Sequence, residues 1–240
     1  RENKVTKIKT DTGEIKLSSK IVKAYLVAGG GNVSDQEVKL FIALCSAQKL
    51  NPFIKEAHLI KYGSSPATMV VSKDVYQKRA DKHPEYQGKK AGIIVLTAEG
   101  KIDYRVGTFY IPSREELVGG WCEVYRKDRE PERVEVSLDE YVGKKKDGTV
   151  NAQWSGKPAT MIRKVAVAQC LREAFTSEFQ GMYVPEEMGV EDTTSNFVVE
   201  ETPQVHQAIE ANTAPTMQDI INEEKQAEKV PVDDFDPMSM

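Results

Sequence analysis

The pattern that most constrains the fold is a helical period from Pro158 to Phe175, which follows a loop containing three consecutive lysines. Proline suits the first position of a helix, because its missing N–H would have no partner there. At about 100° per residue, most apolar side chains of this segment point away from Thr160 and Arg163. The pattern therefore predicts a long helix that packs on a core and carries cations near its first turn.

The start of this helix has features of an anion-binding site. The residues that fall on its charged side are Lys157, Thr160, Arg163 and Lys164. The free N–H groups and the dipole of a helix N-terminus add partial positive charge there, and phosphate is an anion that such an end binds. Trp154 lies just upstream. The alternative is a solvated charged surface, and this stretch alone does not decide between the two.

The net charge of −4 averages two regions of opposite sign. Residues 186–240 contain 14 acidic residues and two basic ones, which gives −12 there and leaves +8 on residues 1–185. This division favours a body that binds polyanions, followed by an acidic extension. Residues 188–240 are predicted to be a disordered acidic tail, and its acidic and apolar end has the composition of a short partner-binding segment.

Strand patterns in the middle of the chain follow one another instead of alternating with helices. A hairpin is expected over 55–62 and 67–71, and then a meander of strands over 92–96, 102–110, 119–126 and 132–137. Earlier helices are expected after Ser18 or Ser19, after Ser34 and after Ser72. The fold class is therefore α+β, a largely antiparallel sheet packed with helices. Residues 1–16 lack a clear period and are predicted to be a flexible arm before a core over 17–187.

The helix after Ser72 offers a second candidate surface. Lys73, Tyr76 and Gln77 share one of its faces with Ala80. An aromatic ring beside a cation and an amide suits a nucleic acid, because bases stack on aromatic side chains. The alternative, which the sequence slightly favours for Tyr76 and Ala80, is that these two side chains pack on the sheet.

The sequence predicts neither a nucleotide cofactor nor a metal. Residues 143–148 have the glycine spacing of a phosphate loop, but Thr149 and Val150 replace the required Lys-Ser/Thr pair. No histidine has ligand spacing to a cysteine or glutamate. Asp103 and Glu123, if they faced each other across neighbouring strands, would leave a metal-dependent DNA nuclease as the alternative function.

The cysteines and the absence of a long apolar run indicate the compartment. Cys45, Cys122 and Cys170 are odd in number, far apart and set among apolar residues, which predicts buried, reduced thiols. No apolar run is long enough to span a membrane, and no signal-peptide pattern occurs. A cytoplasmic protein is therefore expected.

The order and spacing of several short motifs resemble the RecT family of phage single-strand annealing proteins, of which the beta protein of phage lambda is a distant member. The resemblance covers about residues 17–187. The segments that carry it are Leu50-Asn51-Pro52-Phe53 with Glu56; Val71 and Asp74; Val124 to Arg129; Trp154, Pro158, Met161, Arg163, Ala166, Gln169-Cys170, Arg172 and Ala174-Phe175; and Gly181 with Tyr183.

The resemblance implies single-stranded DNA binding and ATP-independent annealing of complementary strands during homologous recombination and DNA repair. It implies an oligomeric ring or helical filament without a catalytic site or cofactor, holding single strands and the annealed duplex. The implied partners are a phage 5′→3′ exonuclease and, through the C-terminal region, the host single-strand-binding protein. The implied source is a phage of a Gram-positive bacterium, acting in the host cytoplasm.

In the beta protein, basic residues on the long helix and the preceding loop are implicated in DNA binding. The resemblance places one of them at Arg172 and others at Ala159 and Val165, so the charge is redistributed here. The alternative for Arg172 is a buried pair with a carboxylate. Arg163 is predicted at the centre of the groove, and Arg129 on an exposed turn at its periphery.

The complete set of candidate DNA contacts combines these stretches. Annealing requires free Watson–Crick edges, so we expect cations that hold the phosphate backbone. The candidates are Lys73, Tyr76, Gln77, Lys127, Arg129, Lys144, Lys145, Lys146, Trp154, Lys157, Thr160, Arg163, Lys164 and Arg172.

Overall fold

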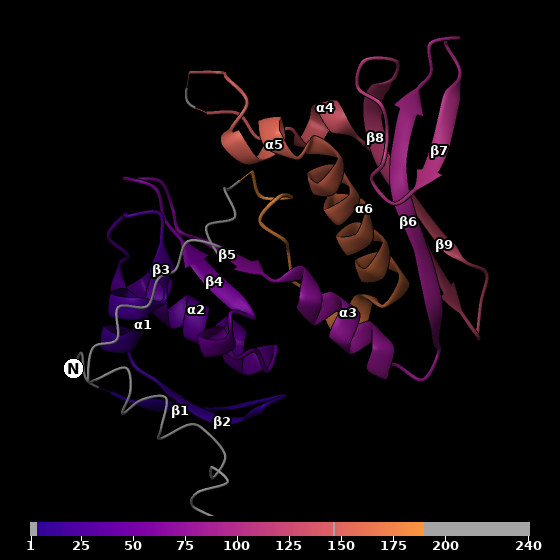
Figure 1. The fold of residues 1–240 in the computed structure, drawn as a ribbon. Helices are drawn as coiled ribbons and strands as arrows, with labels where there is room; N and C mark the ends of the chain where they lie inside the picture. Colours follow the sequence, from indigo (N-terminus) through magenta and orange to yellow (C-terminus); the bar gives the residue numbers. More distant parts are fainter. Residues whose placement is uncertain (1–3, 146, 190–240) are drawn as a thin grey trace, which may run out of the picture. The chain divides into compact units, whose positions relative to one another are not determined.

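A four-stranded antiparallel sheet packs against the long helix α6, Pro158–Ala174 (Figure 1). The strands are β6 Tyr86–Leu96, β7 Ile102–Val106, β8 Glu116–Arg126 and β9 Glu132–Ser137, in the order β7-β6-β8-β9. The structure is a computed structural model, and it describes residues 4–145 and 147–189. It confirms the α+β class and the helix that begins at Pro158.

The strand order differs from the expected meander at one point. β8 pairs with β6 instead of β7, so β7 stays at the edge of the sheet. The reason is apolar content: Ile93 and Val95 on β6 and Val124 on β8 are completely buried, whereas β7 leaves Ile102 more than half exposed. The most apolar strands take the centre because both of their neighbours and α6 shield them from water.

Helix α6 lies close against β8. A Cβ added at Gly120 would lie 2.7 Å from the carbonyl oxygen of Ile162, so only glycine permits this approach. Ile162, Val165, Ala166 and Leu171 are completely buried on the helix. The packing fixes the rotation of α6, and with it the directions of Arg163 and Lys164.

The N-terminal residues form a β-hairpin, so the prediction of a flexible arm over 1–16 is wrong for residues 6–16. β1 Thr6–Thr10 pairs antiparallel with β2 Gly13–Leu17. Ile8, Ile15 and Leu17 are at most 2% exposed. Only one or two apolar residues lie on each strand, so the alternation of period 2 is hidden by the lysines between them.

The remaining elements mostly follow the expected boundaries. Ser18 caps α1 Ser19–Tyr25, a capping box of Ser34 and Glu37 starts α2 Asp35–Ala47, and Ser72 caps α3 Lys73–Lys82. The expected hairpin is present as β4 Ala57–Ile60 and β5 Thr68–Val71, and the short β3 Val27–Ala28 adds a parallel partner to β4. Shorter elements are the 3-10 helix Pro52–Ile54, α4 Leu138–Tyr141, α5 Ala152–Gly156 and α7 Thr176–Phe179.

The structure also bears on the predicted cysteine state and on the predicted tail. Cys45, Cys122 and Cys170 are free and completely buried, as predicted. The predicted tail falls almost wholly on residues 190–240, which lie outside the described residues, so its disorder and the boundary near 187 stay predictions. In the part of the chain that the structure describes, no helix is long and apolar enough to cross a membrane.

Candidate nucleic-acid interface

Residues 143–148, which we call the lysine loop, form a short hairpin-like turn that begins at the buried Gly143. Lys144 and Val150 form an isolated antiparallel β-bridge, and the N–H of Lys145 donates to the carbonyl of Thr149 at 2.7 Å. At the base, a Cβ on Gly143 would lie 2.8 Å from Cδ1 of Trp154, so the loop starts in direct contact with that ring. Lys144 and Lys145 are exposed, and Lys146 lies outside the described residues.

The loop leads through α5 to the start of α6. Asn151 caps α5 by accepting the N–H of Trp154 at 3.0 Å, and Trp154 is only 2% exposed. Trp154 therefore belongs to the core, and its buried ring does not suit the DNA contact for which it was a candidate. Lys157 precedes Pro158 as the N-cap of α6 and is exposed, whereas Thr160 is half-buried. In Figure 1 the loop projects beyond α5.

We call Lys144, Lys145 and Lys157 the exposed lysine set. Among the described residues, none of the three lies within ion-pair distance of a carboxylate. The nearest acid in sequence, Asp147, accepts hydrogen bonds from the hydroxyl and the N–H of Thr149 at 2.6 and 2.9 Å, which lower the pKa of Asp147. The three ammonium groups are therefore available to an external anion.

The next two cations along α6 already hold partners inside the protein. The Nε of Arg163 donates to the carbonyl of Ala91 on β6 at 3.4 Å, so this side chain ties the helix to the sheet. Lys164 pairs at 2.7 Å with Glu186, whose side chain is 2% exposed. Arg163 is thus only partly available for a phosphate, and Lys164 neutralises a buried carboxylate.

Arg172 is fixed more completely. Its guanidinium donates to both carboxylate oxygens of Glu187, at 3.1 and 2.6 Å, and to the carbonyl of Met182 at 3.1 Å. It also stacks on the ring of Tyr183, with 4.6 Å to the centroid. The buried-pair alternative for Arg172 is therefore what the structure shows, and the side chain holds the segment after α7 against α6.

The end of β8 and the basic turn over residues 127–131 contact the C-terminal end of α6. Arg126 and Arg129 both donate to the carbonyl of Ala174, the last residue of the helix, and Arg126 lies 4.5 Å from the ring centroid of Phe175. Cations at a helix C-terminus are favourable because they meet the negative end of the dipole. Lys127 donates to the carbonyl of Pro84 at 2.8 Å. Lys127 and Arg129 therefore contact the fold rather than only solvent.

The candidate residues on α3 also differ in their exposure, with Lys73 exposed and Tyr76 buried. Tyr76 is 1% exposed and stacks on Phe179 at 5.0 Å between centroids, so Tyr76 packs in the core, as the sequence slightly favoured, and its role as a DNA contact is corrected. Lys73 is exposed beside Asp74, at 3.3 Å. Gln77 donates to Asp81 at 2.6 Å and accepts from Lys89.

Lys89 is a cation that sequence reasoning missed, because the strand was expected to begin only at Gly92. Burial lowers the pKa of Lys89, and the neighbouring charges of Arg163 and Lys73 lower it further. Lys89 donates to Gln77 on α3, and Arg163 on α6 donates to Ala91, two residues further along β6, so this strand lies between the two surfaces that the sequence suggested. The alternation of β6 places Lys89 on the same face as the buried Ala91, which is the feature that indicates its direction.

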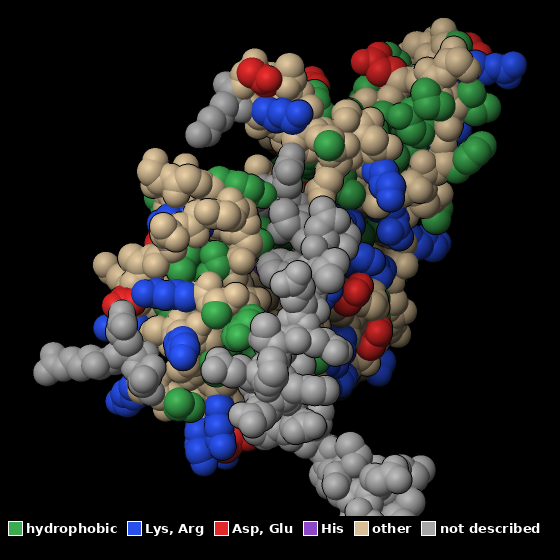
Figure 2. All heavy atoms as spheres, turned by 60° about the vertical axis from the view of Figure 1, so that its left-hand side comes forward, with side chains coloured by type: hydrophobic (Ala, Val, Ile, Leu, Met, Phe, Trp, Pro, Cys, Tyr) green, Lys and Arg blue, Asp and Glu red, His purple; other side chains and the backbone are tan. Residues whose placement is uncertain are grey.

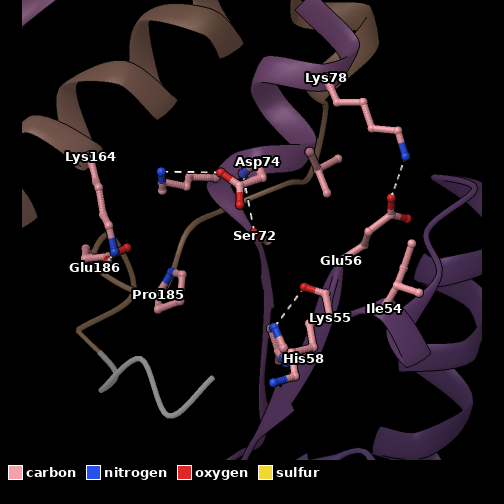
Figure 3. A pocket seen from close by; sticks show the side chains of 12 residues that line it. Ile54, Lys55, Glu56, His58, Ser72, Asp74, Lys78, Lys164, Pro185 and Glu186 are labelled. Atoms are coloured by element: carbon pink, nitrogen blue, oxygen red, sulfur yellow. Dashed lines mark hydrogen bonds and ion pairs between the residues drawn. The ribbon is translucent and has the colours of Figure 1, made fainter. Parts of the chain in front are cut away.

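A cleft of about 450 Å³ opens where α3 begins (Figure 3). Its charged lining consists largely of pairs: Lys78 with Glu56 at 3.0 Å, Lys73 with Asp74, and Lys164 with Glu186. A phosphate backbone in this cleft would meet three carboxylates. The cleft is therefore a weaker anion site than the exposed lysine set.

The nuclease alternative depended on Asp103 facing Glu123. The structure contradicts this, because β6 lies between their strands. Asp103 pairs with Arg105 at 3.0 Å, and Glu123 accepts from the hydroxyl of Tyr125 at 2.9 Å. Within residues 4–145 and 147–189, no three His, Cys, Asp or Glu side chains gather as a metal site.

A family model described as the RecT family matches residues 12–200, which is most of the chain and includes every candidate contact. No curated protein matches the sequence.

Proposed function

The chain belongs to the RecT family, and we propose that it anneals DNA by holding phosphate backbones on the exposed lysine set. Family membership implies a single-strand annealing protein of recombination, which binds single-stranded DNA. The finer proposal is that annealing needs neither ATP nor a catalytic site. The protein supplies positive charge along a strand and leaves the bases free to pair.

The observation that carries this proposal is the availability of Lys144, Lys145 and Lys157. These ammonium groups are exposed and lack carboxylate partners among the described residues. The start of α6 adds the partial positive charge of its free N–H groups. Lysine contacts to phosphate give affinity without reading base sequence, which suits a protein that must pair any two complementary strands.

Lys89 and Arg163 extend the positive surface from the start of α6 toward α3. Arg163 has one donor committed to Ala91, and its remaining N–H groups can reach a phosphate. Lys73, the exposed first residue of α3, adds a further cation. We propose that the strand enters at the exposed lysine set and that this second group makes weaker contacts.

Annealing also requires two strands to meet. We propose a homo-oligomeric ring or filament, in which neighbouring copies extend the lysine-lined surface and raise the local concentration of bound strands. The proposed partners are a phage 5′→3′ exonuclease, which supplies single strands, and the host single-strand-binding protein, contacted through the C-terminal region. Residues from 188 onward are proposed to serve recombination in the cell and to be dispensable for annealing purified oligonucleotides.

The test replaces the exposed lysine set by glutamine, as K144Q/K145Q/K157Q. Each lost phosphate contact should reduce the slope of log affinity against log salt by about 0.7 on single strands, so the triple variant should lose about 2. The matched control is K39Q/K82Q/K101Q, which removes the same charge from three other exposed lysines. Equal slopes for the folded triple variant and the control would contradict the proposal.

A further inference from the structure

The β1–β2 hairpin presents a lysine-rich face that takes no part in the candidate interface. Its register places Lys7 opposite Lys16 and Lys9 opposite Glu14, and strand alternation puts all four side chains on one face. They are exposed, whereas the apolar side chains of the other face are buried. We call Lys7, Lys9, Glu14 and Lys16 the hairpin face. Figure 2 shows lysine and arginine side chains at the lower left, in the part of the molecule that contains the N-terminal elements.

The hairpin is held on the rest of the fold. The N–H of Asp11 donates to the carbonyl of Lys49 at 3.1 Å, and the side-chain amide of Asn51 donates to the hydroxyl of Thr12 at 3.0 Å. The carboxylate of Asp11 lies 3.6 Å from Nε of Arg79 on α3, so this acid already has a partner. The strands that carry the lysines are therefore ordered before a ligand binds, which reduces the entropy cost of binding.

Two of the three lysines on the hairpin face have no carboxylate within ion-pair distance among the described residues, namely Lys9 and Lys16. Glu14 lies 3.5 Å from Nζ of Lys7. Lys16 also stands directly opposite Lys7, and like charges at opposite positions of a strand pair are destabilising. A polyanion bound to this face would remove that repulsion.

We propose that the hairpin face is a second backbone site, which captures the complementary strand after a first strand is bound at the exposed lysine set. The ligand is the phosphate backbone of single-stranded DNA, because unpaired ammonium groups complement its charge without contacting bases. The two surfaces share no element, since the hairpin is a separate two-stranded sheet and the exposed lysine set lies in the lysine loop and at the cap of α6. One copy therefore contacts two strands whose bases stay free to pair.

The contact at the hairpin face is weak, because two unpaired lysines neutralise few phosphates. In the proposed ring or filament the same face recurs on neighbouring copies, so a strand captured by one copy meets the next face at a high effective concentration. Weak contacts also suit annealing, since the incoming strand leaves the hairpin face once its bases have paired.

This inference rests on the proposed function, because a second-strand site has a use only in a protein that already holds a first strand. The two sites have different readouts. The exposed lysine set determines the affinity for one strand, whereas the hairpin face determines the rate at which the complementary strand joins it.

The test is K9Q/K16Q in the full chain. Affinity for one oligonucleotide, and its salt slope, should be unchanged. The rate at which a complementary oligonucleotide anneals to the preformed complex, followed by energy transfer between labelled strands, should fall about tenfold at physiological salt, because two phosphate contacts are lost. The slope of log rate against log salt should become less steep by about 1.4, or about 0.7 for each contact.

Two control variants separate charge from structure. K39Q/K101Q removes the same charge from two other exposed lysines and should anneal like the unmodified protein. K9R/K16R keeps the charge of the hairpin face and should retain the annealing rate. The urea midpoint of K9Q/K16Q should be equal to that of the unmodified protein or higher, because the repulsion between Lys7 and Lys16 is removed.

Equal annealing rates for K9Q/K16Q and K39Q/K101Q would overturn the inference and leave the hairpin face to solvent or to an acidic protein partner. A lower affinity of K9Q/K16Q for the first strand would also overturn it, because the hairpin would then belong to the first-strand site. An unmodified protein that binds no single oligonucleotide would instead contradict the proposed function.

Discussion

Two regions of positive charge lie next to each other along the chain, and they differ in what surrounds them. On the body of α6, Arg163, Lys164 and Arg172 each hold a carbonyl or carboxylate of the protein. In the loop and at the first cap of the helix, the exposed lysine set faces solvent. The first region is therefore occupied in holding elements together, and the second is available for a ligand.

The difference shows that charge in a sequence does not by itself identify a binding surface. Glu186 and Glu187 supply the partners of Lys164 and Arg172 from the segment after α7. When a cation that pairs with a buried carboxylate is removed, the protein is destabilised, because the carboxylate is left without its partner. A cation in solvent is removed at little cost to the fold, so its variants report on binding.

The largest expected effect tests Trp154, which anchors the base of the lysine loop. Trp154→Ala should destabilise the protein by about 3–5 kcal/mol, because the ring is 2% exposed and its loss leaves a cavity. Urea unfolding measures this loss, with Trp154→Phe as the milder control. A stable Trp154→Ala protein that binds DNA weakly would instead show that the ring stacks on bases.

Arg172→Ala comes next and tests the region that holds the fold. Breaking its pair with Glu187, whose side chain is 4% exposed, should cost about 3 kcal/mol because the carboxylate is left without its partner. Affinity for single-stranded DNA, corrected for the folded fraction, should be unchanged. A salt slope lowered by about 0.7 in folded Arg172→Ala protein would move Arg172 into the DNA interface.

Arg163 lies at the border of the two regions and should show a mixed effect. Arg163→Ala should weaken DNA binding by about tenfold, the lower end for a charge-assisted contact, because its Nε is committed to Ala91. Arg163→Lys should recover only part of this, since lysine lacks the guanidinium fork. The control is Arg129→Ala, at the opposite end of α6.

Equal and small losses of affinity for Arg163→Ala and Arg129→Ala would exclude the start of α6 as the DNA surface. The comparison is made on protein whose unfolding midpoint has been measured, because both arginines also hold the helix in place. Lys73 and Lys89 would then be the next residues to replace.

The smallest expected effect concerns acid stability of the fold. Glu37 accepts hydrogen bonds first from Lys61 and then from the N–H groups of Ser34 and Ala67, which lower its pKa from 4.5 to about 2. Because the folded pKa is the lower one, this stabilisation is present above pH 4.5 and is lost as pH falls toward 2.

Glu37→Gln should therefore be less stable than the unmodified protein near pH 6, with the gap narrowing in acid. Urea midpoints at several pH values below 6 measure this. A gap that stays constant with pH would contradict the assigned pKa. Lys144→Gln, in the exposed lysine set, should show no such dependence and serves as the matched surface control.

Much of the fold could be predicted from local patterns. The caps at Ser34 and Ser72 and the proline at position 158 set helix starts that the structure confirms. The β1–β2 hairpin could not be predicted as easily, because Ile8 and Ile15 stand alone among polar residues and their burial depends on distant elements. The same reason explains β8 beside β6, since strand order is decided by total burial.

The candidate site was predictable in position but not in detail. The lysine loop and the helix start are located by sequence alone. Whether Lys164 is free depends on Glu186, and whether Trp154 is buried depends on the turn at Gly143. Lys89 was missed because its contact with Gln77 on α3 and its proximity to Arg163 on α6 arise only when β6 packs beside both helices. Contacts between distant segments decide each of these points.

The central claim is that DNA contacts mainly the exposed lysine set, more weakly Arg163, and neither Lys164 nor Arg172. The most direct measurement is lysine acetylation of the unmodified protein, with and without a single-stranded oligonucleotide, read by mass spectrometry. The account predicts that DNA protects Lys144, Lys145 and Lys157, whereas the exposed Lys39 and Lys101 react equally in both states. Equal reactivity of Lys144, Lys145 and Lys157 with and without bound DNA would contradict it.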